Sequence, residues 1–147
     1  TRIAEHPLIK DDLVAIVPPG HPWSERTEVG LDDFPEEPLI LPPRNILTRR
    51  SVEEKFRRAG VELNLAFEVG NSEAIKRMVS CGLGVSIICS CAITKEVESK
   101  WLVSIPLSGL RMPRYISLVT NREQEAQPDL RAFIDFVLAL YPGKEIL

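Results

Sequence analysis

The sequence has little positive charge and no long apolar run. Its 18 lysine and arginine residues stand against 21 acidic residues, which gives the chain a formal net charge of −3 and an isoelectric point near 5.5. Domains that bind nucleic acid directly usually carry a basic patch on their surface. No stretch approaches the roughly 20 apolar residues of a membrane-spanning helix. We therefore expect neither direct DNA binding by this chain nor membrane insertion.

Signals of secretion and of metal binding are also lacking. Residues 1–5 do not form the apolar stretch of a signal peptide, so we expect a cytoplasmic protein. The three cysteines, Cys81, Cys89 and Cys91, are an odd number, and no histidine stands near them at a zinc-ligand spacing. The sequence thus predicts free, buried thiols and no metal or cofactor.

Groups for catalysis are sparse. The two histidines, His6 and His21, both adjoin prolines, and neither has a serine, cysteine or carboxylate at a motif spacing. Gly82 and Gly84 lack the rest of a dinucleotide-binding fingerprint and follow a predicted helix, so they indicate the end of that helix. The sequence therefore indicates a protein that is not an enzyme.

Short apolar runs alternate with helical patterns along the chain. The runs at 13–17, 38–43, 65–69, 85–89, 101–106 and 115–120 predict strands. Apolar residues at helical spacing predict helices at 51–59 and 72–81, and a largely buried helix that begins at Pro128. Thr48 and Ser51 are candidate N-caps, Ser51 and Glu54 have capping-box spacing, and Gly60 is placed to end the helix. This alternation predicts an α/β fold with a mainly parallel sheet flanked by helices.

One feature interrupts the alternation. The strands predicted at 101–106 and 115–120 follow one another without a helix between them, as if the chain left one sheet and entered another. Entry at 13–17 and exit near Pro106 would give two crossing strands. This is the hinge plan of two-lobed binding proteins, which hold their ligand in the cleft between the lobes.

Several segments carry a family pattern in their order and spacing. They are residues 12–18, 20–22, 38–41, 48–56, 67–69, 72–75, 78–87, 114–119 and 133–136. The strongest is 78–87, Met-Val-Ser-Cys-Gly-Leu-Gly-Val-Ser-Ile. Together these segments resemble the effector-binding (substrate-binding) domain of LysR-type transcriptional regulators over nearly the whole chain. One departure is Cys89, which stands where members of the family often have proline.

The resemblance implies a two-lobed fold like that of type 2 periplasmic binding proteins. Residues 1–15 would end the first lobe, 16–106 would form the complete second lobe, and 107–147 would return to the first lobe with the C-terminal helix. The first lobe would be partial. The winged helix-turn-helix, through which such a regulator binds DNA, would lie outside the chain.

Two loops that precede helices are candidates for binding a small-molecule effector. Helix N-termini attract anions, and ligands of open α/β sheets bind beyond the carboxyl ends of the strands. The candidate residues are Arg44, Asn45, Thr48, Arg49, Asn71, Ser72 and Cys89. The two arginines suit a carboxylate or an inorganic anion, and the resemblance favours the loop around Thr48. The alternative is that the hydroxyl groups only cap helices and the arginines are solvated.

The resemblance also implies a homodimer, built from the helix at 51–59 and the strand at 65–69. That strand is apolar at four of its five positions, as befits a covered edge. The helix carries a basic strip of Lys55, Arg57 and Arg58, which could meet an acidic partner surface or remain solvated.

Two other functions share this scaffold. A solute-binding protein of a transport system would have the same fold, and its upstream sequence would be a signal peptide instead of a helix-turn-helix. An enzyme would need a nucleophile, a base and an acid together, and the sequence shows no such set.

Overall fold

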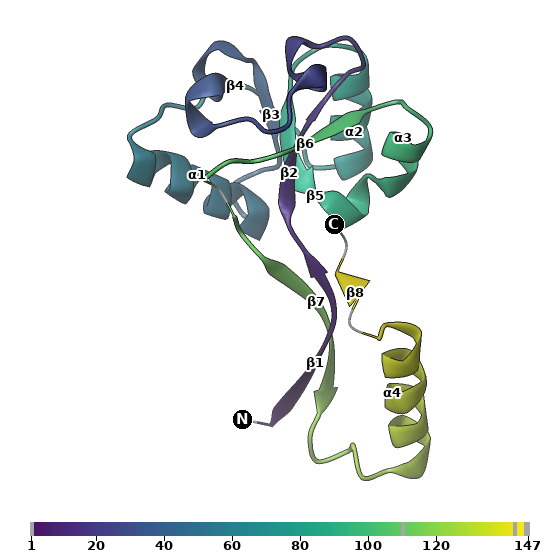
Figure 1. The fold of residues 1–147 in the computed structure, drawn as a ribbon. Helices are drawn as coiled ribbons and strands as arrows, with labels where there is room; N and C mark the ends of the chain where they lie inside the picture. The colour runs from purple at the N-terminus through teal and green to yellow at the C-terminus, as the bar shows by residue number, and fades with distance from the viewer. Residues whose placement is uncertain (1, 110, 143, 146–147) are drawn as a thin grey trace. The chain divides into compact units, whose positions relative to one another are not determined.

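The structure is a computed structural model that describes residues 2–109, 111–142 and 144–145. The chain divides into two compact units (Figure 1): unit 1 comprises Thr1–Asp12 and Pro113–Leu147, and unit 2 comprises Leu13–Met112.

Unit 2 is built on a mixed sheet. Its described strands are β2 (Leu13–Val17), β3 (Leu39–Leu41), β4 (Leu65–Glu68), β5 (Ser86–Cys89) and β6 (Val103–Pro106). β3 is parallel to β4 and is joined to the start of β5 by a parallel bridge between Leu39 and Val85. β2 is antiparallel to both β5 and β6. The α/β fold is confirmed, and the unit 2 sheet is mixed: β4, β3 and β5 are parallel to one another, whereas β2 runs antiparallel to its neighbours.

The antiparallel direction of β2 follows from the route of the chain. The first residues of β2 pair with the last residues of β6, as in Val14 with Pro106, and Val17 pairs with Val103. β2 enters unit 2 and β6 leaves it at the same end, so the two strands must run in opposite directions. These are the two crossing strands that the sequence predicts.

Side chains alternate between the two faces of this sheet. Leu39 and Leu41 pack in one core cluster with Val52 and Phe56 of α1 (Leu47–Ala59), whereas the intervening Ile40 packs in another. The first cluster also holds Trp23 and Phe34, from the 3-10 helices η1 (Pro22–Glu25) and η2 (Leu31–Glu36). The second holds Ile75 and Val79 of α2 (Ser72–Ser80). The sheet is therefore covered by α1 on one face and by α2 on the other.

The remaining described elements of unit 2 lie between β5 and β6. They are the 3-10 helix η3 (Ser90–Ala92) and the short helix α3 (Thr94–Glu98). Ile93 and Leu102, which flank α3, pack in the same cluster as α2.

α1 begins earlier than the sequence predicts. A turn closed by the amide of Ile46 on the carbonyl of Pro43 (3.0 Å) leads directly into the helix, so Ile46 is the N-cap and supplies no side-chain cap. Thr48 and Ser51 therefore lie inside the helix, and both the cap assignments and the capping box are wrong. The C-terminal end is confirmed: Gly60 ends α1 in the left-handed conformation, with φ of +71°.

Unit 1 contains a strand that the apolar pattern does not reveal. β1 (Ile3–Asp11) pairs antiparallel with β7 (Arg114–Asn121), and β8 (Lys144–Glu145) pairs parallel with β1. β1 includes Pro7, beside which the pairing register shifts, and several charged residues, so it lacks a clean strand signal.

The last helix, α4 (Pro128–Leu140), begins at Pro128 as predicted. The prediction that it is largely buried is wrong. Among its residues only Ile134 is buried, while Phe133 and Phe136 are 53% and 62% exposed. The described part of unit 1 contains a single three-stranded sheet, of order β7-β1-β8, and so offers little apolar surface to cover a helix. None of the helices within the described residues is long and apolar enough to span a membrane.

Candidate functional site

The structure brings the candidate residues to one edge of the sheet in unit 2. Arg44, Asn45, Thr48 and Arg49 follow β3, Asn71 and Ser72 follow β4, and Cys89 is the last residue of β5. Because these three strands are parallel, their carboxyl ends lie at the same edge. This is the edge at which open α/β sheets bind ligands.

The N-terminus of α1 is the most open part of this edge. Arg44, Asn45 and Leu47 are exposed, and Thr48, the second residue of the helix, is partly exposed. The first turn contains no acidic side chain, and no side chain caps it from the N-cap position. The amide groups and the positive end of the helix dipole therefore favour an anion here.

Arg49 lies beneath this turn and faces inward. Its side chain is 2% exposed, and its Nη1 donates to the carbonyl of Pro42 (3.1 Å) while its Nη2 donates to Glu53 Oε1 (2.7 Å). Glu68 Oε2, at the end of β4, lies 3.7 Å from Nη1. The Nε atom is buried without a hydrogen-bond partner, the sole such side-chain atom among the described residues. Arg49 thus connects α1 to the ends of β3 and β4 through a hydrogen bond to Pro42 and an ion pair with Glu68.

Glu53 contacts both candidate arginines. Its Oε1 accepts from Arg49 Nη2 and also from the Nε of Arg44 (3.3 Å), whose side chain is 78% exposed. Burial alone would raise the pKa of Glu53, but the hydrogen bond and charge of Arg49, with a smaller contribution from Arg44, hold it below its ordinary value. Glu53 is not among the candidates predicted from the sequence, although its i+4 spacing from Arg49 is a usable signal.

The N-terminus of α2 is already capped. Asn71 Oδ1 accepts from the amides of Glu73 (2.8 Å) and Ala74 (3.3 Å), so Asn71 caps α2, while Ser72 is exposed. The amides of Glu73 and Ala74 therefore already have an acceptor within the chain.

The thiols are less buried than the sequence predicts. Cys89 and Cys91 are partly exposed and Cys81 is exposed. Each lies at or near the end of an element: Cys81 is the C-cap of α2, Cys89 is the last residue of β5, and Cys91 lies in η3. Within the described residues, no group of three or more metal-ligating side chains is placed to hold an ion.

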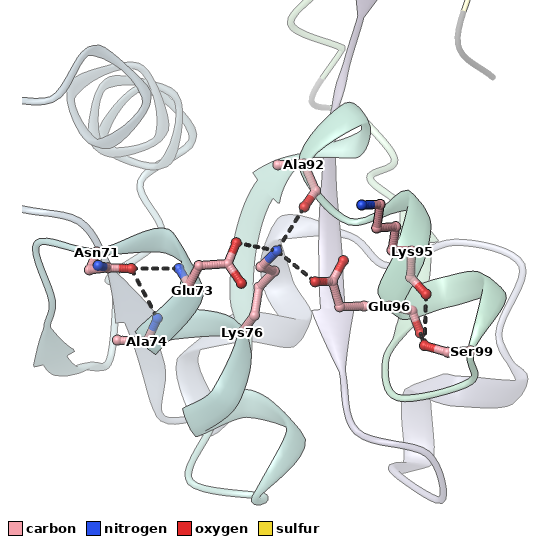
Figure 2. Close-up of polar contacts among 8 residues, drawn as sticks. All are labelled: Asn71, Glu73, Ala74, Lys76, Ala92, Lys95, Glu96 and Ser99. Carbon is pink, nitrogen blue, oxygen red and sulfur yellow. Dashed lines mark hydrogen bonds and ion pairs between the residues drawn. The ribbon is translucent and has the colours of Figure 1, made fainter.

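A buried lysine on α2 forms a second polar cluster (Figure 2). Lys76 Nζ contacts Glu73 Oε1 at 2.6 Å, Glu96 Oε1 at 2.7 Å and the carbonyl of Ala92 at 3.1 Å. Burial alone would lower the pKa of Lys76, but the two carboxylates outweigh it and raise this pKa. Three acceptors match the three protons of the ammonium group, so Lys76 joins α2 to α3 and leaves no donor for a ligand.

A small hollow lies beside this cluster. It has a volume of about 50 Å³, and its lining includes Lys76, Glu96 and Arg77, whose guanidinium carbon lies 4.7 Å from the centre of the Trp101 ring. The cluster of Lys76, Glu73 and Glu96 is not predicted from the sequence. The i, i+3 spacing of Glu73 and Lys76 was a signal, whereas Glu96 comes from a different helix 20 residues later.

The family model of the LysR substrate binding domain matches residues 1–142. The chain belongs to this family. It is 31% identical over 132 residues to the "RuBisCO operon transcriptional regulator" of Allochromatium vinosum, an alignment that covers 90% of the chain and 44% of that protein. The chain thus spans less than half the length of this relative.

Solved LysR regulatory domains share the fold. The CcmR regulatory domain of Synechocystis PCC6803 in complex with 2-PG is 20% identical, with a TM-score of 0.85 over 97% of this chain and 69% of that one. The effector-binding domain of QuiR in complex with shikimate is 21% identical, with a TM-score of 0.78 over 99% of this chain and 68% of that one. These likenesses confirm the type 2 periplasmic-binding-protein-like fold of a LysR substrate-binding domain.

Proposed function

We propose that this LysR domain senses a small anionic effector at the N-terminus of α1 and is not an enzyme. The observation that carries the proposal is an uncapped helix N-terminus, free of acidic side chains, at the carboxyl ends of parallel strands. Arg44, Asn45 and Thr48 stand around it. Two structural neighbours are complexes with small molecules, 2-PG and shikimate, and the latter is a carboxylate.

The effector would act on transcription through a helix-turn-helix domain outside this chain, in the cytoplasm, by changing the geometry of a dimer or tetramer. This effect on transcription distinguishes the proposed regulator from a solute-binding protein of a transport system. In a regulator, the ligand changes the affinity of the intact protein for its DNA, whereas a transport protein of the same fold binds its ligand without any such effect. Titration of labelled upstream DNA with and without ligand distinguishes them.

Thr48→Ala is expected to weaken anion binding about tenfold, because a hydrogen bond from a hydroxyl group to a charged ligand is lost. The free energy of unfolding should change by less than about 1 kcal/mol, because Thr48 is not the helix cap. Calorimetric titration of the intact protein with 2-PG, shikimate and inorganic phosphate measures the first quantity, and thermal unfolding measures the second. Ser51→Ala removes a hydroxyl group one turn further along α1 and is the matched control. Equal affinities in both variants would refute this site.

We also propose that the domain forms a homodimer through α1 and β4. All four residues of β4 are exposed in the single chain, including Leu65 at 38% and Phe67 at 42%, and β3 covers one edge of the strand. Such an apolar edge suits burial against a second copy. The basic strip contributes less than the sequence suggests, because Arg57 and Arg58 already pair with Glu54 at 2.7 and 2.6 Å.

Phe67→Asp is expected to shift the protein from dimer to monomer in sedimentation velocity at micromolar concentration, because it places a charge in the apolar contact. Leu83→Asp changes a residue of similar exposure, 48%, in the loop between α2 and β5, and should leave the dimer intact. A dimer that survives Phe67→Asp, or that is lost equally in both variants, would rule out this interface.

A further inference from the structure

Arg44 is paired with a carboxylate of α1. It precedes the N-cap of α1 by two residues, and its Nε lies 3.3 Å from Glu53, in the second turn of the helix. This contact engages the guanidinium with a side chain beyond the first turn. To reach a ligand at the amide groups of the first turn, Arg44 must leave Glu53.

The contacts of Glu53 with Arg49 and with Arg44 differ in length and in solvent exposure. Its contact with Arg49 is short, at 2.7 Å, and involves a guanidinium that is 2% exposed, so this pair is fixed. Its contact with Arg44 is longer, at 3.3 Å, and Arg44 is 78% exposed. An exposed ion pair of this kind is weak and exchanges readily. When Arg44 departs, Glu53 keeps Arg49 and is not left as an uncompensated charge.

We infer that Glu53 competes with the effector for Arg44, so that binding transfers this arginine from the carboxylate to the anion. The inference rests on the proposed anion site and adds how the affinity of that site is set. Glu53 acts here as a positioning residue, since it holds Arg44 and does not itself touch the ligand. The buried Nε of Arg49, which has no hydrogen-bond partner, marks the same network as incompletely satisfied.

The test is the affinity of the intact protein for inorganic phosphate, measured by calorimetry in wild type and in Glu53→Gln. Loss of the competing carboxylate should strengthen binding about two- to fivefold, the range set by the strength of an exposed ion pair. Structural damage would weaken binding, so a gain separates competition from a purely structural role. Glu54→Gln is the matched control: it removes the adjacent carboxylate, which pairs with Arg57 and Arg58, and should change the affinity less than twofold.

The gain in phosphate affinity in Glu53→Gln must also depend on Arg44. In an Arg44→Gln background, Glu53→Gln should no longer strengthen binding, and a gain that persists there would overturn the inference. If Glu53→Gln fails to fold because Arg49 loses its partner, Glu53→Asp retains a carboxylate on a shorter side chain, and a smaller gain is expected. Wild type and Glu53 variants that bind phosphate equally, while Thr48→Ala weakens binding, would refute this inference alone. Failure of wild type to bind phosphate would overturn both proposals.

Discussion

Replacement of Gly84 by alanine is expected to lower the free energy of unfolding of this LysR domain by about 3 kcal/mol or more. Gly84 has a φ of +159°, and a Cβ built there would lie 2.2 Å from the carbonyl oxygen of Pro38. The contact occurs where β3 and β5 join, since Val85 donates to that same carbonyl at 2.9 Å. A methyl group would force the two strands apart in the centre of the unit 2 sheet.

Gly82→Ala is the matched control for this effect. Gly82 also has a positive φ, +75°, but a Cβ there would meet no atom within 4 Å. Its replacement should cost only the conformational strain of the left-handed region, about 1 kcal/mol. Urea denaturation followed by circular dichroism gives both values. Similar losses in the two variants would show that the close approach to Pro38 does not matter.

The elements that could be predicted from the sequence are those with a local signal. The run at 13–17 and the stripe of Val52 and Phe56 identify β2 and α1, because buried positions repeat with the period of the element. Gly60 ends α1 as predicted, since its conformation depends on its own backbone. β1 was missed because Pro7 and the charged residues around it break the local pattern. The direction of β2 depends on β6, about 90 residues later, and no local pattern encodes such a pairing.

Prediction of the candidate site is limited in the same way: local spacing could be predicted from the sequence, but contacts between distant segments could not. The sequence could place Arg44, Thr48 and Arg49 in one short segment after β3, because spacing along the chain decides that. It could not show that Arg49 is buried, since its side chain contacts Pro42, in the loop after β3, and Glu68, at the end of β4. Which arginine remains available to a ligand is therefore a property of the tertiary structure.

The cluster of Lys76 leads to the second large expected effect. Lys76→Met should lower the free energy of unfolding by about 2 kcal/mol at neutral pH. The variant leaves Glu96, whose side chain is 19% exposed, without its counter-ion, and the carbonyl of Ala92 without this donor. The value lies below the range for fully buried pairs because Glu73, the other carboxylate, is 74% exposed and regains solvent. Lys95→Met, which removes an exposed lysine of α3, should change stability by less than about 0.5 kcal/mol.

The ion pair of Lys76 and Glu96 also predicts how the loss of stability in Lys76→Met depends on pH. The hydrogen bond from Lys76 holds the pKa of Glu96 below its ordinary value of 4.5. A carboxyl group whose pKa is lower in the folded state contributes stability above its unfolded pKa and loses it as the pH falls through the folded pKa. The difference in unfolding free energy between wild type and Lys76→Met should therefore be full near pH 7 and shrink as the pH falls below about 4.5. On the alkaline side, the raised pKa of Lys76 means that its contribution persists up to its ordinary value of 10.5 and fades only above it. Urea denaturation of both proteins from about pH 3.5 to pH 7 measures this difference, and a gap that stays constant across the range would show that Lys76 does not stabilise the ionised form of Glu96.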